Sequence, residues 1–165
     1  MRRTIIGVMG GSEADPRTTQ HAYDIGRLIA ERGWLLLNGG RPTGVMDASA
    51  RGCREGGGLS VGILFDQERE AASEHLDIVI PTGMGAARNI ANVLASDVVV
   101  ACRGSGGTLS EIALALRFER PVVLLDFDPG AAFLDACGKG RWFLADTPTV
   151  AADRIAGLLE EMGRA

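Results

Sequence analysis

Short apolar runs alternate along the chain with longer segments in which apolar residues recur at helical spacing. The runs predict buried strands, because parallel strands that are covered on both faces lack the alternation of a half-exposed sheet. They span residues 4–9, 34–37, 59–65, 76–80, 97–101 and 121–125, with a weaker run at 142–144. The helical segments between and after them cover residues 16–32, 43–55, 86–95, 108–118, 130–137 and 148–162.

Strands and helices that alternate in this way predict an α/β fold, a three-layer, Rossmann-like, doubly wound parallel sheet. Six to seven strands are expected, in an order of about 3-2-1-4-5-6(-7). The place of the 76–80 strand in that order stays open. The pattern contains no linker and no internal repeat, so we expect residues 1–165 to form a single Rossmann-like domain that binds a nucleotide or phosphate.

The helix predicted at 86–95 has two distinct faces. Ile90, Val93 and Leu94 are expected to face the core, since apolar residues at this spacing form one stripe. Asn89 and Asn92 then either lie on the surface or donate hydrogen bonds to a ligand.

Glycine is unusually frequent, with 23 residues in 165, about twice the usual share of ~7%. Most glycine clusters directly follow a predicted strand: Gly10-Gly11, Gly39-Gly40, Gly83-x-Gly85 and Gly104-x-Gly106-Gly107. Arg41, Arg88 and Arg103 fall at the same strand ends. The carboxyl ends of parallel strands meet at one edge, where such folds bind ligands, and glycine loops that open helices bind anions. The sequence therefore predicts a phosphate site there, unless these glycines only form turns and the arginines are solvated.

Charge and cysteine content exclude several classes of protein. The formal charge is −4, with no basic stripe of the kind that binds nucleic acid. No apolar run approaches the ~18 residues of a membrane span, and the first apolar run is too short for a secretory segment. Three unpaired cysteines and two distant histidines give no metal site, and Cys102 reads as a small buried hydrophobe rather than a nucleophile. We expect a cytoplasmic protein with no membrane, nucleic-acid or metal partner.

Three common nucleotide and hydrolase motifs are absent. Lys139 lacks the Ser or Thr that must follow it in a P-loop. Arg88 stands where the dinucleotide fingerprint has its third glycine, and Asn38 where it has an acidic ribose ligand. Arg103 replaces the first glycine of a nucleophile elbow around Ser105. A P-loop protein, an NAD enzyme and a serine hydrolase are all disfavoured.

Residues 103–111 concentrate the candidate chemistry, because their glycines let a ligand approach the backbone closely. Thr108 and Glu111 match a capping box, in which Glu111 would cap its own helix; alternatively, Glu111 faces the mouth of the anion site. Arg88 lies in the first turn of a helix, where the dipole disfavours a cation. It could pair with Asp97, face solvent or bind an anion.

A family resemblance rests on two motifs. Gly-x-x-Arg-Asn at 85–89, then a strand, then Gly-x-x-Gly-Thr-Leu-Ser-Glu at 104–111 resemble the LONELY GUY (LOG) superfamily, long described as lysine decarboxylases. Gly39-Gly40 followed by Gly44-Val45-Met46 is similar to that family's second loop. Within the superfamily, the chain resembles a short bacterial subgroup near the molybdenum-cofactor carrier proteins and the DprA-like Rossmann domains.

The resemblance implies a homodimer or homotetramer that binds a small phosphorylated ligand, either a nucleotide or the molybdenum cofactor, with no cofactor required. LOG enzymes are phosphoribohydrolases, which hydrolyse the N-glycosidic bond of a nucleoside 5′-monophosphate. Glu111 would act on the ribose or on the attacking water, and Arg88 would hold the phosphate or sugar. The alternative is a carrier of the molybdenum cofactor that performs no catalysis.

The strand-end pattern and the resemblance together give the residues of the expected site. The catalytic candidates are Arg88 and Glu111. The candidates for binding the ligand or its phosphate are Gly10, Gly11, Ser12, Gly39, Gly40, Arg41, Gly83, Met84, Asn89, Arg103, Gly104, Ser105, Gly106, Gly107 and Thr108.

The chain departs from the LOG pattern at three positions. Arg103 and Ser105 replace a proline and a glycine, and Ser110 stands where an acidic residue is common. These differences bear on catalysis more than on binding and leave the hydrolase and the carrier both open. A lysine decarboxylase is not supported, because the only lysine, Lys139, lies outside the motif. A DNA-processing role, by analogy with DprA, is disfavoured by the net charge.

Overall fold

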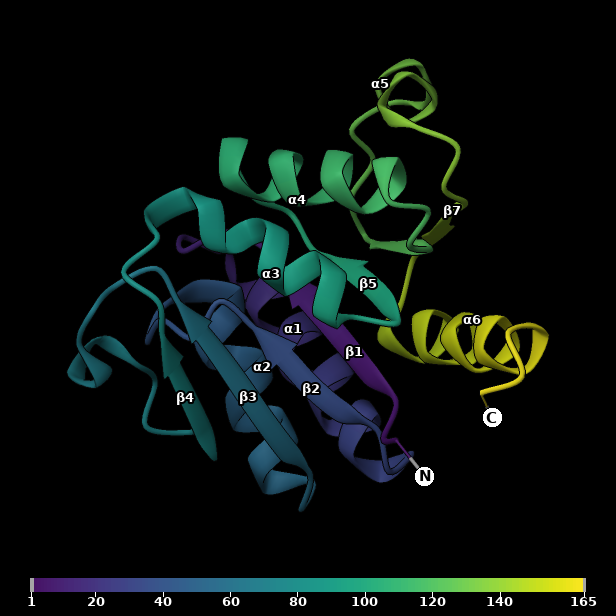
Figure 1. Ribbon diagram of the computed structural model, residues 1–165. Coiled ribbons are helices and arrows are strands. Elements are labelled where there is room, and N and C mark those ends of the chain that lie inside the picture. The colour runs from purple at the N-terminus through teal and green to yellow at the C-terminus, as the bar shows by residue number, and fades with distance from the viewer. Residues whose placement is uncertain (1, 165) are drawn as a thin grey trace.

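The structure is a computed structural model that describes residues 2–164, and its centre is a parallel sheet of seven strands (Figure 1). The strands are β1 (Ile5–Met9), β2 (Leu35–Asn38), β3 (Leu59–Leu64), β4 (Ile78–Pro81), β5 (Val98–Ala101), β6 (Val122–Leu125) and β7 (Trp142–Ala145). Their order in the sheet is β4-β3-β2-β1-β5-β6-β7, and all six pairings are parallel. The predicted doubly wound α/β fold is confirmed.

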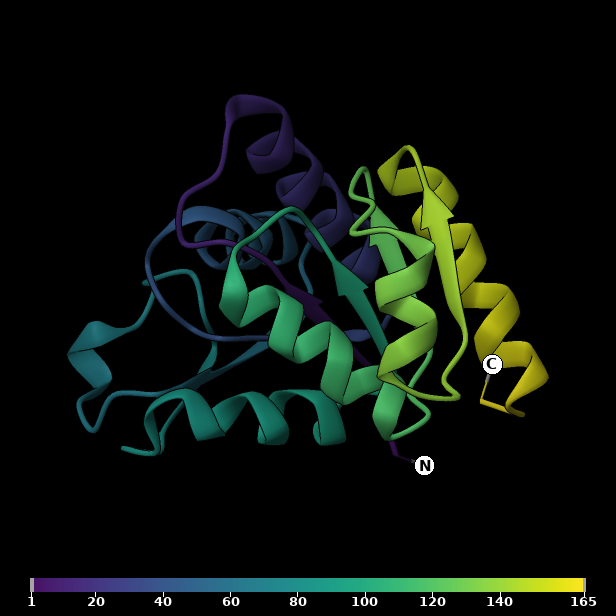
Figure 2. The same cartoon turned by 90° about the horizontal axis from the view of Figure 1, so that it is seen from above.

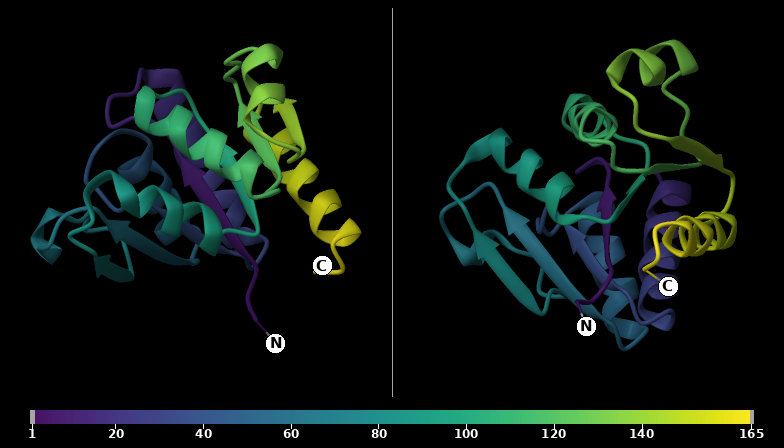
Figure 3. Two further views of the ribbon diagram at one scale, coloured as in Figure 1. Left: turned by 45° about the horizontal axis from the view of Figure 1, so that its top comes forward. Right: turned by 45° about the vertical axis from the view of Figure 1, so that its right-hand side comes forward.

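Six helices form the two outer layers. They are α1 (Pro16–Glu31), α2 (Gly44–Glu55), α3 (Arg88–Ala95), α4 (Gly106–Arg117), α5 (Ala131–Cys137) and α6 (Pro148–Glu161). Helices α1, α2 and α6 pack on one face of the sheet and α3, α4 and α5 on the other (Figure 3). Viewed from above, α4 lies between α3 and α5 (Figure 2). Among the residues that the structure describes, no helix is long and apolar enough to cross a membrane.

The strand at 78–81 takes an outer place in the sheet. Without it, the strands follow the expected 3-2-1-4-5-6 order, and β4 adds to the outside of β3, with Ile78 opposite Val61. No α-helix covers the β3–β4 connection, which holds only a 3₁₀ turn at Arg69–Ala71. Pro81, expected to stop this strand, is its last residue; an edge strand tolerates proline because its outer N–H groups have no sheet partner.

The central strands are buried on both faces, which explains why their sequences do not alternate. Along β5, Val98 and Val100 join the cluster under α1, α2 and α6, whereas Val99 and Ala101 join the cluster under α3 and α4. All four side chains are fully buried. The carboxyl ends of these strands therefore emerge together at one rim of a rigid layer.

Helix α3 presents a different face to the sheet from the one expected. Val93 is buried as predicted, but Ile90 and Leu94 are 42% and 43% exposed. Asn89 and Asn92 are buried in their place, with hydrogen bonds to Ser110 and Glu111 of α4. The inner face of α3 is thus polar because it meets polar side chains of α4 at the rim.

Two glycines let α1 and α2 approach each other closely. A methyl group at Gly26 would clash with the Ser49 carbonyl, and one at Gly52 would clash with the Tyr23 carbonyl. Both obstacles are backbone atoms, which cannot rotate away. The close packing of these two helices therefore depends on glycine at both positions.

We expect Gly52→Ala to lower the free energy of unfolding by about 1–3 kcal/mol, since overpacking outweighs the gain in helix propensity. The matched control is Gly157→Ala in α6, where the added methyl group meets no atom within 4 Å. The control should be neutral or stabilising by up to about 1 kcal/mol. Urea unfolding measures both variants, and equal effects would contradict this account of the α1–α2 contact.

Candidate functional site

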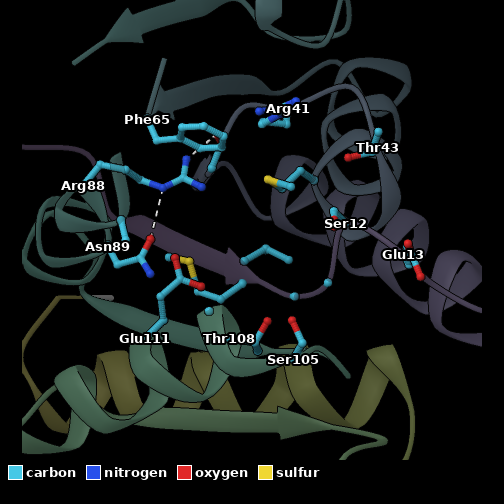
Figure 4. A pocket seen from close by; sticks show the side chains of 18 of the residues that line it. Ser12, Glu13, Arg41, Thr43, Phe65, Arg88, Asn89, Ser105, Thr108 and Glu111 are labelled. Atoms are coloured by element: carbon cyan, nitrogen blue, oxygen red, sulfur yellow. Dashed lines mark hydrogen bonds between the residues drawn. The ribbon is translucent and has the colours of Figure 1, made fainter. Parts of the chain in front are cut away.

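A cavity of about 730 Å³ opens at the carboxyl rim of the sheet (Figure 4). Its walls come from the β1–α1 loop, the β2–α2 loop, the end of β3 and the starts of α3 and α4. The predicted site residues that line it are Gly10, Gly11, Ser12, Gly39, Arg41, Arg88, Asn89, Ser105, Gly107, Thr108 and Glu111. Five segments that are distant in sequence thus meet at one place.

The other predicted residues lie outside the lining: Gly40, Gly83, Met84, Arg103, Gly104 and Gly106. Gly104 shapes the loop, because a side chain there would clash with Thr108 and approach the Gly11 nitrogen to 2.8 Å. Arg103 lies instead over the Phe127 ring, 5.9 Å from its centroid. It is therefore placed away from the cavity that Arg41 and Arg88 line.

Sequence reasoning missed several lining residues, of which Phe65 is the most informative. Its ring lies near two guanidinium groups, 4.7 Å from that of Arg41 and 5.4 Å from that of Arg88. Such cation–π contacts hold the ring and both cations beside the cavity. Phe65 ends a predicted strand run, so its position could have marked it. Glu13, Thr43 and Met46 also line the cavity and belong to no motif.

Arg88 is buried and tied to two backbone carbonyls. Its Nη1 donates to the carbonyls of Gly39 and Ile63, each at 2.5 Å, and its Nε donates to Asn89 at 3.1 Å. Burial lowers the pKa of Arg88, and the nearby carboxylate of Glu111 opposes that shift. The alternative pairing with Asp97 does not occur, because Asp97 pairs with Arg2 and Arg164.

Glu111 points into the cavity and is not a helix cap. Helix α4 begins at Gly106 after the N-cap Ser105, so Glu111 lies beyond the first turn. Its side chain is 7% exposed and accepts a 3.1 Å hydrogen bond from Asn92. Burial raises its pKa to about 7, opposed by Asn92 and Arg88. Near neutral pH the carboxyl group can therefore either accept or donate a proton.

Two helices begin at the cavity with an N-cap hydroxyl that is not used for capping. In α1 the Asp15 carboxylate accepts from the Thr18 N–H at 2.8 Å, and in α6 the Thr147 hydroxyl caps in the same way. Within residues 2–164, the N-caps Thr43 of α2 and Ser105 of α4 make no such bond, and both line the cavity. Free hydroxyl and N–H groups at helix starts suit an anion.

Cys102 lies below the rim and takes no part in this arrangement. It is 1% exposed, and burial raises the pKa of its thiol to about 12. A thiol with this pKa is protonated at neutral pH and is a poor nucleophile. The expectation that Cys102 is a buried hydrophobe is confirmed.

A profile of the SLOG cluster4 family matches residues 3–151. The chain belongs to this family. Two solved structures resemble the SLOG protein along nearly its whole length. The molybdenum cofactor binding protein of the phototrophic bacterium Rippkaea orientalis has a TM-score of 0.91 and 44% identity over 96% of this chain and 99% of its own. The molybdenum cofactor carrier protein of Chlamydomonas reinhardtii has a TM-score of 0.88 and 38% identity over 96% and 99%.

A curated relative points to the other branch of the superfamily. The cytokinin riboside 5′-monophosphate phosphoribohydrolase of Mycobacterium tuberculosis is 32% identical over 131 residues, which are 74% of the SLOG protein and 70% of the relative. The resemblance to the LOG superfamily and to molybdenum-cofactor carriers, stated from the motifs alone, is therefore confirmed.

The buried carboxyl group of Glu111 should make the stability of the SLOG protein depend on pH. Glu111 ionises at a higher pH in the folded chain than the ordinary value of 4.5, so the folded state binds more protons between pH 4.5 and about 7. Stability therefore falls as pH rises through this window. Relative to the wild type, Glu111→Gln should gain on the order of 3 kcal/mol over the window. Urea unfolding at pH 5 and pH 8 measures the difference, and a constant difference would contradict the assignment.

Proposed function

We propose that this SLOG protein binds the molybdenum cofactor, a pterin phosphate that carries molybdenum, in the rim cavity and holds it without chemical change. The observation that carries the proposal is the match over 96% of the chain, at 44% identity, to a protein named for binding that cofactor. The cavity volume of about 730 Å³ supports it, since small-molecule sites usually enclose ~300–1,000 Å³.

The lining residues offer partners for both ends of a pterin phosphate. Ser105, Thr108 and the first N–H groups of α4 bind the phosphate, which the N-terminus of a helix favours. Glu111 accepts hydrogen bonds from the amino and ring N–H groups of the pterin. Because Glu111 and Arg88 are buried together, the pterin end lies in the deeper part of the cavity.

A second candidate function, phosphoribohydrolysis, is favoured by a specific observation. A carboxyl group with a pKa of about 7 beside a buried guanidinium can take a proton from a water that attacks the sugar carbon. Arg88 would then hold the phosphate or the sugar. The 32% identity to a phosphoribohydrolase supports this alternative.

We further propose a homodimer or homotetramer in the cytoplasm. Ile90, Leu94 and Phe118 are each more than 40% exposed on the layer formed by α3 and α4, where a second copy would cover them. The three cysteines, Cys53, Cys102 and Cys137, are unpaired, as is usual in a reducing compartment.

Two adjacent glycines provide a matched test of the cofactor site. Gly106 and Gly107 both lie in the first turn of α4, and a methyl group at either meets no atom within 4 Å. Only Gly107 lines the cavity. Gly107→Ala should weaken cofactor binding by about tenfold because the methyl group occupies ligand space, whereas Gly106→Ala should bind like the wild type.

Binding is measured by the fluorescence of the oxidised pterin that remains with the purified protein. Both alanine variants should be as stable as the wild type or up to about 1 kcal/mol more stable, since alanine favours a helix. Failure of the wild type to retain added cofactor would refute the proposed function. Equal binding by the two variants would displace the cofactor from the start of α4.

The hydrolase alternative has its own assay. Purified protein is incubated with a panel of nucleoside 5′-monophosphates, and ribose 5-phosphate is measured. A carrier releases none from any nucleotide. Release that Glu111→Gln reduces by at least about 100-fold would instead identify Glu111 as a general base and establish the hydrolase.

A further inference from the structure

A second cavity of about 500 Å³ adjoins the first and belongs to no function considered above. We call it the side cavity; its polar lining is Ser12, Glu13, Thr19, Thr43, Asp47 and Arg51. Ser12, Glu13 and Thr43 line both cavities, so the two meet where the β1–α1 loop faces the start of α2. In Figure 4 these three residues lie across the first cavity from Arg88 and Glu111.

Two side chains of α2 are held in place in the side cavity. Asp47 and Arg51 lie one turn apart, which puts them on the same face of the helix. The Asp47 carboxylate accepts a 2.7 Å hydrogen bond from the Ser73 hydroxyl, and the Arg51 guanidinium lies 5.1 Å from the centroid of the Tyr23 ring. These contacts fix the orientation of both groups without occupying all their hydrogen-bonding capacity.

The charges of the side cavity select the chemistry that it can take. Glu13 and Asp47 supply two carboxylates and Arg51 one guanidinium. This surplus of negative charge disfavours a further phosphate and favours a neutral group with several hydrogen-bond donors. A nucleoside is such a group, through its ribose hydroxyls and the N–H groups of its base.

The order of groups along the two cavities also suits one extended ligand. The buried end holds Glu111 and Arg88, the starts of α4 and α2 offer the anion-binding hydroxyls of Ser105 and Thr43, and the side cavity follows beyond Thr43. Anything esterified to a phosphate bound between these helix starts would therefore enter the side cavity.

We propose that the side cavity is a nucleoside subsite, so that the protein binds a dinucleotide form of the pterin ligand, joined through a pyrophosphate to guanosine. The pterin end of this ligand rests on the proposed function, whereas the nucleoside end rests on the side cavity alone. Guanine is selected because its N1–H and amino group donate side by side to one carboxylate, here Asp47. Adenine presents an acceptor at N1 and is repelled there.

The test is isothermal titration of the full chain with GDP, ADP and inorganic pyrophosphate. GDP should bind at least tenfold more tightly than either pyrophosphate or ADP. Asp47→Asn should bring GDP to within twofold of ADP and leave pyrophosphate binding unchanged, because the amide N–H₂ opposes the donors of guanine. Asparagine keeps an oxygen for the Ser73 hydroxyl, so the contact that supports the fold is retained.

Two further variants complete the test. Arg51→Ala should weaken GDP about fivefold and pyrophosphate less than twofold, which keeps the proposal testable if Asp47→Asn folds poorly. The matched control is Arg54→Ala on the same helix, since Arg54 is exposed, donates to the Glu74 carbonyl and lies outside both cavities. The control should leave all three affinities unchanged.

Equal binding of GDP and pyrophosphate would overturn the nucleoside subsite, and so would a preference for GDP over ADP that survives in Asp47→Asn. The fluorescence assay for the pterin separates this result from the proposed function. A protein that retains the pterin but does not prefer GDP refutes only the side cavity. A protein that prefers GDP but retains no pterin supports the nucleoside subsite and refutes the cofactor assignment.

Discussion

The geometry of the rim depends on the buried guanidinium of Arg88. A buried cation must have hydrogen-bond partners, and Arg88 finds them in the carbonyls of Gly39 and Ile63, which lie at the ends of two neighbouring strands. These bonds fix the start of α3 against the sheet and set one wall of the cavity. Gly39 must lack a side chain, because a methyl group there would lie 2.8 Å from the guanidinium. The glycine and the arginine that the sequence places at separate strand ends are thus two halves of one contact.

The two helical layers serve different purposes as a result. On one face, α1 and α2 pack closely through Gly26 and Gly52 and build a dry core. On the other face, α3 turns Asn89 and Asn92 inward toward α4 and keeps Glu111 in a buried, polar setting that raises its pKa to about 7. Holding such a carboxyl group costs stability, which is usual where a protein binds or transforms a ligand. The chain therefore confines this cost to one layer and keeps the other for stability.

The fold and much of the site follow from local patterns. Buried parallel strands read as plain apolar runs, and glycines with arginines at strand ends identified most of the residues that line the cavity. Long-range pairing is not encoded locally, so the place of β4 beside β3 could not be derived from its own residues. The exposure of Ile90 and Leu94 was missed because helical spacing defines a stripe and not what the stripe meets. The supposed capping box failed because α4 begins at Gly106, two residues earlier than expected.

The same side chains can serve a carrier or a hydrolase, and the occupant of the space beside Glu111 decides between them. A general base needs a water between its carboxylate and the sugar carbon. A carrier fills that space with ligand N–H groups, which hydrogen-bond the carboxylate and favour its charged form. Because Asn92 already donates to one oxygen of Glu111, a ligand donor at the other would leave no site for an attacking water. In a fold where Arg88 and Glu111 are fixed by the sheet, function is therefore set by how far the ligand fills the deep end of the cavity.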